Sequence, residues 1–255
     1  MSLNGKTALV TGGASGVGAA VARLFVAKGC KVAIADINLQ AAKALADELG
    51  EAAMPCVLDV GDAGQVSNVV DGIVTQWGAI DILVNSAGVL LNKPFIETEP
   101  AEFERMLRIN LLGSCLVAQA SARRMLGRGG RIINISSAAG LMGFPGRTAY
   151  AASKGGIIAA TRVMAIELAE HDILVNTVAP GPVETAMTAG VYDERFRRGI
   201  TASVPLNRVA TPEEIAEVVE FLASPASRYV TGQTISADGG MSITGITRKS
   251  LSANG

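Results

Sequence analysis

The segment Thr11-Gly12-Gly13-Ala14-Ser15-Gly16-Val17-Gly18 follows a short apolar run at the start of the chain and precedes a stretch with helical spacing. A strand, a glycine-rich turn and a helix in this order let the backbone approach a pyrophosphate, whose charge meets free N–H groups and the positive end of the helix dipole. A tight turn without a ligand is the alternative, because such motifs also occur by chance. Five residues of the turn are expected to contact a dinucleotide: Gly12, Ser15, Gly16, Val17 and Gly18.

Asp36 provides a check on that interpretation, because it ends the second apolar run, about 20 residues beyond the turn. Its carboxylate can accept hydrogen bonds from the adenosine ribose hydroxyls and would repel a 2′-phosphate. The next residues, Ile37 and Asn38, and Gly13 in the turn carry no positive charge that would neutralise such a phosphate. The sequence therefore predicts NAD rather than NADP, with a simple helix cap as the alternative role of Asp36.

Short apolar runs alternate with amphipathic stretches along the whole chain. The runs are nearly apolar throughout, as expected for parallel strands covered on both faces, and they lie at Lys6–Thr11, Lys31–Ala35, Ala53–Leu58, Ile80–Asn85, Arg131–Ser136, Ile173–Val178 and Thr234–Ala237. Helical spacing marks Val17–Lys28, Leu39–Leu49, Asp62–Trp77, Pro100–Leu126 and Ala149–Glu170. This alternation predicts an α/β fold with a doubly wound parallel sheet in one domain, residues 1–255.

Two later segments carry local signals. A helix is predicted after Thr211, which can cap it, with Pro212 in its first position and Glu214 closing a capping box. The segment Glu184–Ser203 is less regular and follows a strand end, where a lid over a ligand would lie.

The composition narrows the class of protein. Of the 255 residues 49% are hydrophobic and 18% charged, and the net charge of −1 without a basic patch predicts no nucleic-acid partner. No apolar stretch is long enough for a transmembrane helix, and the N-terminus lacks the apolar core of a signal peptide. The three cysteines are far apart, which predicts free thiols, no zinc site and a cytoplasmic location.

Two further strand ends suit the adenine and the nicotinamide ribose. Asp59 and Val60 follow the third run, and Asn85, Ala87 and Gly88 lie at the end of the fourth. Small residues at such an end let a cofactor lie against the backbone. Each of these ends taken alone is also compatible with an ordinary loop.

Tyr150 and Lys154 form the candidate catalytic pair at the start of a long predicted helix. Residues four apart share a helix face, so the phenol and the ammonium point into the same space. A phenol titrates near pH ~10 when unperturbed, and a nearby ammonium or the positive nicotinamide of NAD⁺ favours the phenolate. An isolated pair of this kind would more often be an exposed helix face.

Ser137 and Asn110 complete the candidate constellation. Ser137 ends the fifth run, where its hydroxyl can orient a substrate oxygen beside the phenol. Asn110 lies inside the predicted helix Pro100–Leu126, where a buried amide can kink the helix and hold a water on a proton path to Lys154. A strand-end cap and a structural hydrogen bond are the alternatives, but all four residues together downstream of a dinucleotide turn argue against coincidence.

The chain resembles the classical short-chain dehydrogenase/reductase family over nearly its whole length. The resemblance rests on the glycine turn, Asp59, Asn85-Ser86-Ala87-Gly88, Asn110, Ser137, Tyr150 with Lys154, and Pro180-Gly181-Pro182 with Thr185. Ser86 stands where the family often has Asn or Ala, and the tail Ile243–Gly255, which we expect to be flexible, runs past the usual end.

The resemblance implies a Rossmann-like sheet of seven strands and a catalytic tetrad of Asn110, Ser137, Tyr150 and Lys154. It also implies that Lys154 holds the nicotinamide ribose hydroxyls. Four residues are implied at the nicotinamide end: Pro180, Gly181, Val183 and Thr185.

These features together predict an NAD(H)-dependent oxidoreductase in which Ser137 holds an alcohol and Tyr150 takes its proton as hydride leaves. The expected pocket walls, Leu90–Pro94, Ala138–Phe144 and Glu184–Tyr192, are mostly apolar or small. They favour a small neutral secondary alcohol or ketone, a polyol or sugar among them. Lys93 and the arginines of the lid are expected to be solvated.

Two other functions are compatible with the same fold. A 3-oxoacyl-thioester reductase would be expected to use NADPH, which Asp36 opposes, and no basic surface for an acidic carrier protein is evident. A dinucleotide-binding scaffold without activity would be expected to lack Tyr150 or Lys154, and a dehalogenase-type protein would have Arg in place of Lys154.

The remaining expectations concern metals and assembly. The single histidine, His171, follows a helix where a cation suits the C-terminal dipole, and no cluster suggests a metal.

The helices Pro100–Leu126 and Ala149–Glu170 are apolar around much of their circumference, which is typical of helices buried on more than one side. With the resemblance, this predicts a homotetramer or homodimer.

Overall fold

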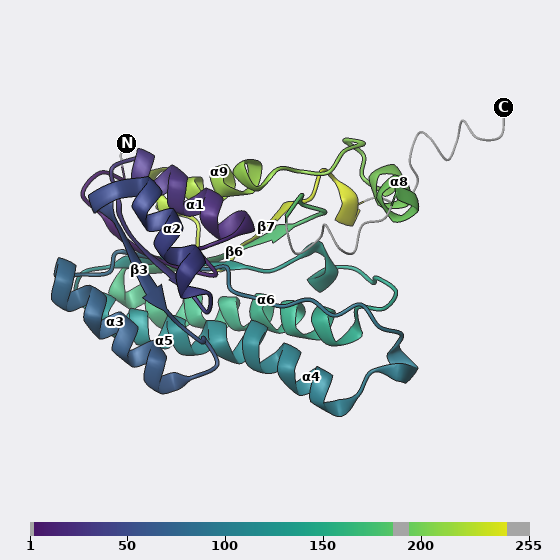
Figure 1. Cartoon of the computed structure of the whole chain (residues 1–255), viewed down its shortest axis with the longest axis horizontal. Coiled ribbons are helices and arrows are strands. Elements are labelled where there is room, and N and C mark those ends of the chain that lie inside the picture. The colour runs from purple at the N-terminus through teal and green to yellow at the C-terminus, as the bar shows by residue number, and fades with distance from the viewer. Residues whose placement is uncertain (1–2, 186–193, 244–255) are drawn as a thin grey trace.

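The computed structural model describes residues 3–185 and 194–243, and its centre is a sheet of seven parallel strands (Figure 1). The spatial order is β3-β2-β1-β4-β5-β6-β7. The strands are β1 Thr7–Thr11, β2 Lys31–Asp36, β3 Ala53–Val57, β4 Ile82–Asn85, β5 Gly130–Ile135, β6 Ile173–Pro180 and β7 Thr234–Ala237. The predicted doubly wound sheet is confirmed, with strand ends within two residues of those predicted.

Helices cover both faces of the sheet. In Figure 1, α1, α2 and α9 lie above it and α3, α4, α5 and α6 below it. The bounds are α1 Gly16–Ala27, α2 Leu39–Leu49, α3 Ala63–Trp77, α4 Pro100–Met106, α5 Ser114–Met125, α6 Thr148–Leu168, α8 Glu194–Ser203 and α9 Pro212–Ala223. Short 3₁₀ turns are η1 Gly50–Ala52, η2 Phe95–Glu97, η4 Ala138–Gly140, η5 Ala169–His171, η6 Pro225–Ser227 and η7 Met241–Ile243.

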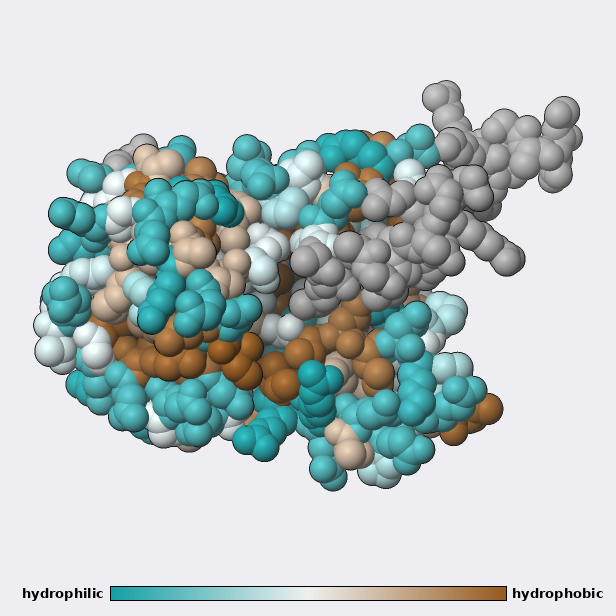
Figure 2. Space-filling view, viewed as in Figure 1, coloured by the Kyte–Doolittle hydropathy of each residue, from teal (hydrophilic) through white to brown (hydrophobic). Residues whose placement is uncertain are grey.

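The strands carry apolar side chains on both faces because each face packs against helices. Ala8 and Val10 of β1 belong to the core under α1, α2 and α9, and Leu9 between them belongs to the core under α3, α5 and α6. Figure 2 shows hydrophilic residues over both helical layers and a band of hydrophobic residues between them on this face. The helices of the described residues include none that is both long and apolar enough to span a membrane.

The chain reverses its direction of winding between β1 and β4, which are neighbours in the sheet but not in the sequence. Connections leaving these two strands run to opposite faces, so a crevice opens outside their carboxyl ends. The glycine turn follows β1, and Ser86–Gly88 follows β4. The topology therefore brings these two loops to the same crevice.

The predicted continuous helix Pro100–Leu126 is wrong in one respect, because a π-helical segment, η3 Leu107–Gly113, separates α4 from α5. The segment contains Asn110, where the sequence predicted a kink. A π turn widens the helix locally, and such turns are frequent at functional sites.

The start of α9 agrees with its sequence signal. The Glu214 N–H donates to the Thr211 hydroxyl and the Thr211 N–H donates to the Glu214 carboxylate at 2.9 Å, with Pro212 in the first helical position. This reciprocal pair satisfies two backbone donors that the helix leaves free.

A row of buried polar side chains crosses β4, β5, β6 and α6. The Asn85 amide donates to Asn134 Oδ1 at 2.9 Å, the Asn134 amide donates to the Thr161 hydroxyl at 2.9 Å, and the Thr177 hydroxyl donates to Thr161 at 2.8 Å. Asn85, Asn134 and Thr177 are direct register partners on adjacent strands. We call these four residues the polar row.

Candidate active site

The glycine turn is packed directly against the loop that follows β4. Gly12 has φ +60°, and a Cβ there would lie 2.7 Å from the Cα of Ala87, so only glycine fits. The Thr11 hydroxyl accepts hydrogen bonds from the N–H groups of Ser86 and Ala87, both at 3.2 Å. A Cβ on Gly18 would lie 2.1 Å from the Gly12 carbonyl oxygen. These contacts fix the floor of a cleft of about 470 Å³.

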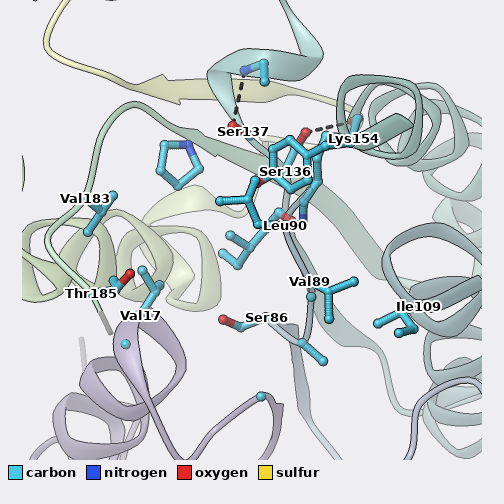
Figure 3. Close-up of a pocket in the computed structure, with 18 of the residues that line it drawn as sticks. Val17, Ser86, Val89, Leu90, Ile109, Ser136, Ser137, Lys154, Val183 and Thr185 are labelled. Carbon is cyan, nitrogen blue, oxygen red and sulfur yellow. Dashed lines mark hydrogen bonds between the residues drawn. The ribbon is translucent and has the colours of Figure 1, made fainter. Parts of the chain in front are cut away.

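The amino end of α1 opens into this cleft. Ser15 is its N-cap residue and has extended backbone, but its side chain makes no capping hydrogen bond, and the first turn carries no acidic residue. Free N–H groups and the positive end of the helix dipole therefore remain for an anion. Ser15, Gly16 and Val17 line the cleft, and Figure 3 shows Val17 beside Thr185. This cradle fits a pyrophosphate.

The Asp36 carboxylate lines the same cleft at the end of β2. One oxygen accepts the Ala14 N–H at 3.1 Å and the other accepts the Asn38 N–H at 2.9 Å. Each oxygen keeps a lone pair for a further donor. The cap of α2 is Asn38, whose side chain accepts the Ala41 N–H, so Asp36 is not the cap of that helix. Among the described residues, no lysine or arginine forms an ion pair with Asp36.

The ends of β3 and β4 supply the next part of the cleft wall. Asp59 and Val60 line it, as do Ala87 and Gly88. One Asp59 oxygen accepts the Gly61 N–H at 2.8 Å, which fixes the loop. The positions fit the predicted contacts with adenine and the nicotinamide ribose.

Asn85 lies elsewhere, although the sequence predicted it as a cofactor contact. Its side chain is buried in the polar row and also donates to the Ser114 carbonyl at 3.0 Å. Asn85 and Gly18 are not among the residues that line the cleft. In the structure both residues lie behind the residues that line the cleft and pack against them.

Ser137, Tyr150 and Lys154 are brought to one end of the cleft by β5 and α6. Figure 3 shows Ser137, Ser136 and Lys154 grouped together, with Leu90 nearby. The Lys154 ammonium nitrogen lies 5.8 Å from the centre of the Tyr150 ring. The Ser137 hydroxyl accepts the Ala139 N–H at 3.2 Å, which keeps its own proton free to donate.

Lys154 is buried and anchored on both its main chain and its side chain. Its ammonium donates to the Ile135 carbonyl at 2.9 Å, and its own carbonyl accepts the Ser136 hydroxyl at 2.8 Å. Burial lowers the pKa of Lys154 from 10.5 to about 8, because a low-dielectric surrounding disfavours the charged form. The group therefore remains mostly protonated at neutral pH and has donors left for a ligand.

Asn110 contacts the cleft wall and α6 from the π-helical segment. Its amide oxygen accepts the Val89 N–H at 2.8 Å, and its amide nitrogen donates to the Val89 carbonyl and to the Ser153 hydroxyl, both at 3.0 Å. The Ser153 hydroxyl in turn donates to the Tyr150 carbonyl at 2.7 Å. Asn110 thus fixes the helical turn that carries Tyr150. Its predicted part in a proton path stays a prediction.

The loop after β6 forms the facing wall. All four residues that the resemblance implied at the nicotinamide end line the cleft: Pro180, Gly181, Val183 and Thr185. A Cβ on Gly181 would lie 2.8 Å from the Cα of Asp238, so the chain is close-packed here. Of the predicted lid, residues 186–193 lie outside the described residues, and α8 follows them.

The cleft walls agree in part with those predicted. Leu90, Phe144 and Val183 line the cleft, but Leu141 is exposed and does not. Met187 lies outside the described residues. Lys93 forms an ion pair with Glu102 at 2.9 Å instead of being merely solvated.

Sequence reasoning missed several residues that line the cleft: Ile37, Leu58, Ser86, Val89, Arg105, Ile109, Ile135, Ser136, Arg147, Pro182, Ile200 and Met241. Several of them lie at or directly after a strand end, among them Leu58, Ser86 and Ser136, so adjacency to a strand end would have found these. Arg147 is different, because it is charged and buried.

The described residues contain no group of three His, Cys, Asp or Glu side chains placed to bind a metal. The cysteines are free, and burial raises the pKa of Cys30 to about 12 and of Cys56 to about 11, so both thiols are protonated at neutral pH. His171 lies near the surface, with a 3.8 Å contact to Glu170.

The sequence has many curated relatives. A family model described as enoyl-(acyl carrier protein) reductase matches residues 12–242. A sorbitol dehydrogenase of Cereibacter sphaeroides is 40% identical over 253 residues, covering 94% of this chain and 98% of that protein. The 3-oxoacyl-[acyl-carrier-protein] reductase FabG of Thermotoga maritima is 42% identical over 247 residues, covering 95% and 100%.

The structure also has solved neighbours. A short-chain type dehydrogenase/reductase from Mycobacterium marinum superposes with a TM-score of 0.91 at 36% identity, covering 94% of this chain and 96% of that one. A putative gluconate dehydrogenase from Agrobacterium tumefaciens gives 0.91 at 33% identity, covering 95% and 98%.

Proposed function

This chain belongs to the short-chain dehydrogenase/reductase family of nicotinamide-dependent oxidoreductases, and on that premise we propose that it uses NAD(H) to interconvert a secondary alcohol and a ketone. One observation carries the proposal: Ser137, Tyr150 and Lys154 line the same cleft as the glycine turn. A dinucleotide whose pyrophosphate is bound at the amino end of α1 would therefore extend along the cleft toward the Tyr150 phenol.

The proposed chemistry assigns each residue one task. Bound NAD⁺ supplies the hydride acceptor. Ser137 donates to the substrate oxygen and orients it, and the Tyr150 phenolate takes the hydroxyl proton. The Lys154 ammonium, 5.8 Å from the ring centre, favours the phenolate form. In the reverse direction the Tyr150 phenol returns that proton to the carbonyl oxygen.

The preference for NAD(H) rests on Asp36. A 2′-phosphate placed beside the Asp36 carboxylate would be repelled by its negative charge. In the described part of the chain, no cation is ion-paired with Asp36 to reduce that repulsion. The adenosine ribose of NAD instead offers two hydroxyl donors to the free lone pairs.

The test is initial-rate kinetics on a panel of secondary alcohols, polyols and ketones, followed by NADH absorbance, with both cofactors. We expect kcat/KM for NAD⁺ to exceed that for NADP⁺ by at least about 100-fold, since like-charge contact costs several kcal/mol. Asp36→Ala should reduce this preference at least about tenfold, and Asp47→Ala, an exposed change on α2, should leave it unchanged. Equal use of both cofactors by the unmodified chain would contradict the assignment.

A second candidate is a 3-oxoacyl-thioester reductase, because several curated relatives at 39–42% identity carry the name 3-oxoacyl-[acyl-carrier-protein] reductase. Other relatives are named for a polyol and a sugar acid, sorbitol and gluconate. An acetoacetyl thioester belongs in the panel for this reason. Preferred reduction of the thioester with NADPH would favour the second candidate.

The predicted homotetramer or homodimer is retained as a proposal. Apolar side chains of the π segment and α6 are exposed in the single chain, among them Leu112, Val163 and Ile166. Association would remove this surface from water. Sedimentation equilibrium tests it, and a monomer at micromolar concentration would contradict it.

A further inference from the structure

The cleft has two parts that differ in the side chains they offer. The part next to the glycine turn holds predicted cofactor contacts, with Ser15, Asp36 and Asp59 among its polar side chains. The other part contains Tyr150 and is formed by the loops after β4, β5, β6 and β7, on the β4 side of the switch point. We call this part the Tyr150 end. Most of its side chains are apolar, among them Leu90, Ala138, Ala139, Phe144, Val183 and Met241.

Two loops are held together on one side of the Tyr150 end. The Lys93 N–H donates to the Gly146 carbonyl at 2.9 Å, and a Cβ on Gly146 would lie 2.5 Å from the Asn92 amide oxygen. These contacts join the loop that carries Leu90 to the loop that carries Phe144. Figure 3 shows Leu90 close to the reacting groups. Leu90 and Phe144 therefore belong to one fixed apolar wall.

A second wall of the Tyr150 end comes from the turn η7 after β7. Met241 lies on this turn, is 4% exposed and lines the cleft. The buried Asp238 carboxylate accepts the Gly240 N–H at 2.9 Å and the Ser242 N–H at 2.8 Å. Asp238 therefore fixes the turn that carries Met241, and this wall too presents an apolar side chain to the cleft.

The hydroxyl and ammonium groups at this end already have assigned partners. The Ser136 hydroxyl donates to the Lys154 carbonyl at 2.8 Å. In the proposed function, Ser137 and Tyr150 hold the reacting oxygen. The Lys154 ammonium donates to the Ile135 carbonyl at 2.9 Å and is implied to hold the nicotinamide ribose. A second oxygen on the substrate would therefore find no free hydroxyl among the described residues that line the Tyr150 end.

Two arginines also line the cleft, and neither provides a buried site for a substrate oxygen. Arg147 is buried and already interacts with another group of the chain. Arg105 lies on α4 and is exposed, so water competes for its guanidinium. Beyond its reacting oxygen, the substrate is therefore recognised mainly by the apolar walls.

We infer that the substrate is apolar apart from its reacting oxygen: an alkyl or aryl ketone, or the matching secondary alcohol, whose hydrocarbon group contacts Leu90, Phe144 and Met241. This inference rests on the proposed function, since it places the reacting oxygen at Tyr150. A further hydroxyl or carboxylate on the substrate would lose its water without gaining a partner, which is unfavourable. The inference narrows the neutral substrate expected from the sequence, which included polyols and sugars.

Matched ketones test the inference on the unmodified chain. The ketones 2-pentanone and 4-hydroxy-2-butanone have the same shape and differ only in a terminal methyl group or hydroxyl. We expect kcat/KM with NADH to be at least about tenfold higher for 2-pentanone. From 2-butanone to 2-hexanone, kcat/KM should rise about fourfold for each added methylene. Equal or faster reduction of 4-hydroxy-2-butanone or 4-oxopentanoate, or no rise along the series, would overturn the inference.

Leu90→Asn changes the apolar wall, because asparagine is close to leucine in size and adds a donor and an acceptor. It should reduce the preference for 2-pentanone over 4-hydroxy-2-butanone at least about fivefold. Leu141→Asn is the matched control, because Leu141 is exposed and does not line the cleft, and it should leave the preference unchanged. An unchanged preference in Leu90→Asn, with normal NADH affinity as evidence of a folded cleft, would overturn the inference. If Leu90→Asn does not fold, the comparison on the unmodified chain decides.

Binding without turnover separates this inference from the proposed function. The Tyr150→Phe chain in complex with NADH should bind 2-pentanone at least about fivefold more tightly than 4-hydroxy-2-butanone, as followed by NADH fluorescence. Such selectivity, without turnover of any alcohol or ketone by the unmodified chain, would refute the proposed function alone. Turnover of a polyol or a hydroxy acid in preference to its apolar counterpart would support the proposed function and refute the inference.

Discussion

Replacing Lys154 by Met should make the folded chain more stable at neutral pH while it removes activity. The pKa of Lys154 in the folded chain is about 8, below its ordinary 10.5. At about 1.4 kcal/mol per pKa unit, the protonated side chain destabilises the folded state by roughly 3 kcal/mol. Methionine has a similar length and no charge, but it loses the hydrogen bond to the Ile135 carbonyl, which costs about 1 kcal/mol.

The sign of the pH dependence follows from linkage. Below pH 8 the lysine is protonated in both states and the folded chain carries the whole penalty. Between pH 8 and 10.5 the unfolded chain binds the proton and the folded chain does not, so the stability of the unmodified chain rises with pH. The Lys154→Met chain should therefore be more stable by about 2 kcal/mol at pH 7, and the difference should fall by about 3 kcal/mol by pH 10.5.

Urea unfolding without cofactor, followed by the fluorescence of the single tryptophan, Trp77, measures this difference. Both chains should also carry Tyr150→Phe, so that titration of that phenol cannot contribute. All other groups cancel in the comparison. A stability difference that stays constant from pH 7 to pH 10.5 would refute the argument, since it would mean that the ammonium is not desolvated.

Four further outcomes are expected. Tyr150→Phe should abolish turnover with NADH affinity unchanged, measured by fluorescence, and near-normal activity would contradict its role. Gly12→Ala should lower the free energy of unfolding by at least about 2 kcal/mol, because Gly12 has φ +60° and the added Cβ would lie 2.7 Å from a neighbouring backbone atom. Gly143→Ala is the control: its added Cβ would meet open space, so it should be neutral in thermal unfolding. Asn110→Ala should cost about 3 kcal/mol in urea unfolding, since it leaves buried partners without hydrogen bonds, and a loss under 1 kcal/mol would argue against that network. Thr211→Ala should cost about 1 kcal/mol with activity unchanged.

The architecture could be predicted from the sequence because its signals are local and repeated. Each strand is a short apolar run, and a run such as Thr234–Ala237 is identical in the structure. The helix cap at Thr211 is likewise a signal contained in four residues. The seven apolar runs correspond to the seven strands of the sheet, and the family resemblance implies the same number.

Other features depend on contacts between distant segments. Asn85 is the last residue of its strand, and its side chain could face either the cleft or the core. It faces the core because it forms a hydrogen bond with Asn134 on the neighbouring strand. The π turn around Asn110 is stabilised by contacts with Val89 and Ser153, which no helical periodicity encodes. Arg147 follows a glycine- and proline-rich loop, where an arginine is normally exposed, so its burial could not be predicted.

The polar row also limits how this scaffold can be recombined. Three hydrogen bonds between its side chains join three strands and a helix, so a shift of register by a single position would leave further amide groups buried without partners. Segments exchanged with relatives should therefore carry Asn85, Asn134, Thr161 and Thr177 as one inherited block. The loops beyond the strand ends lie outside that block, and specificity can diverge there while the acid–base helix keeps its alignment.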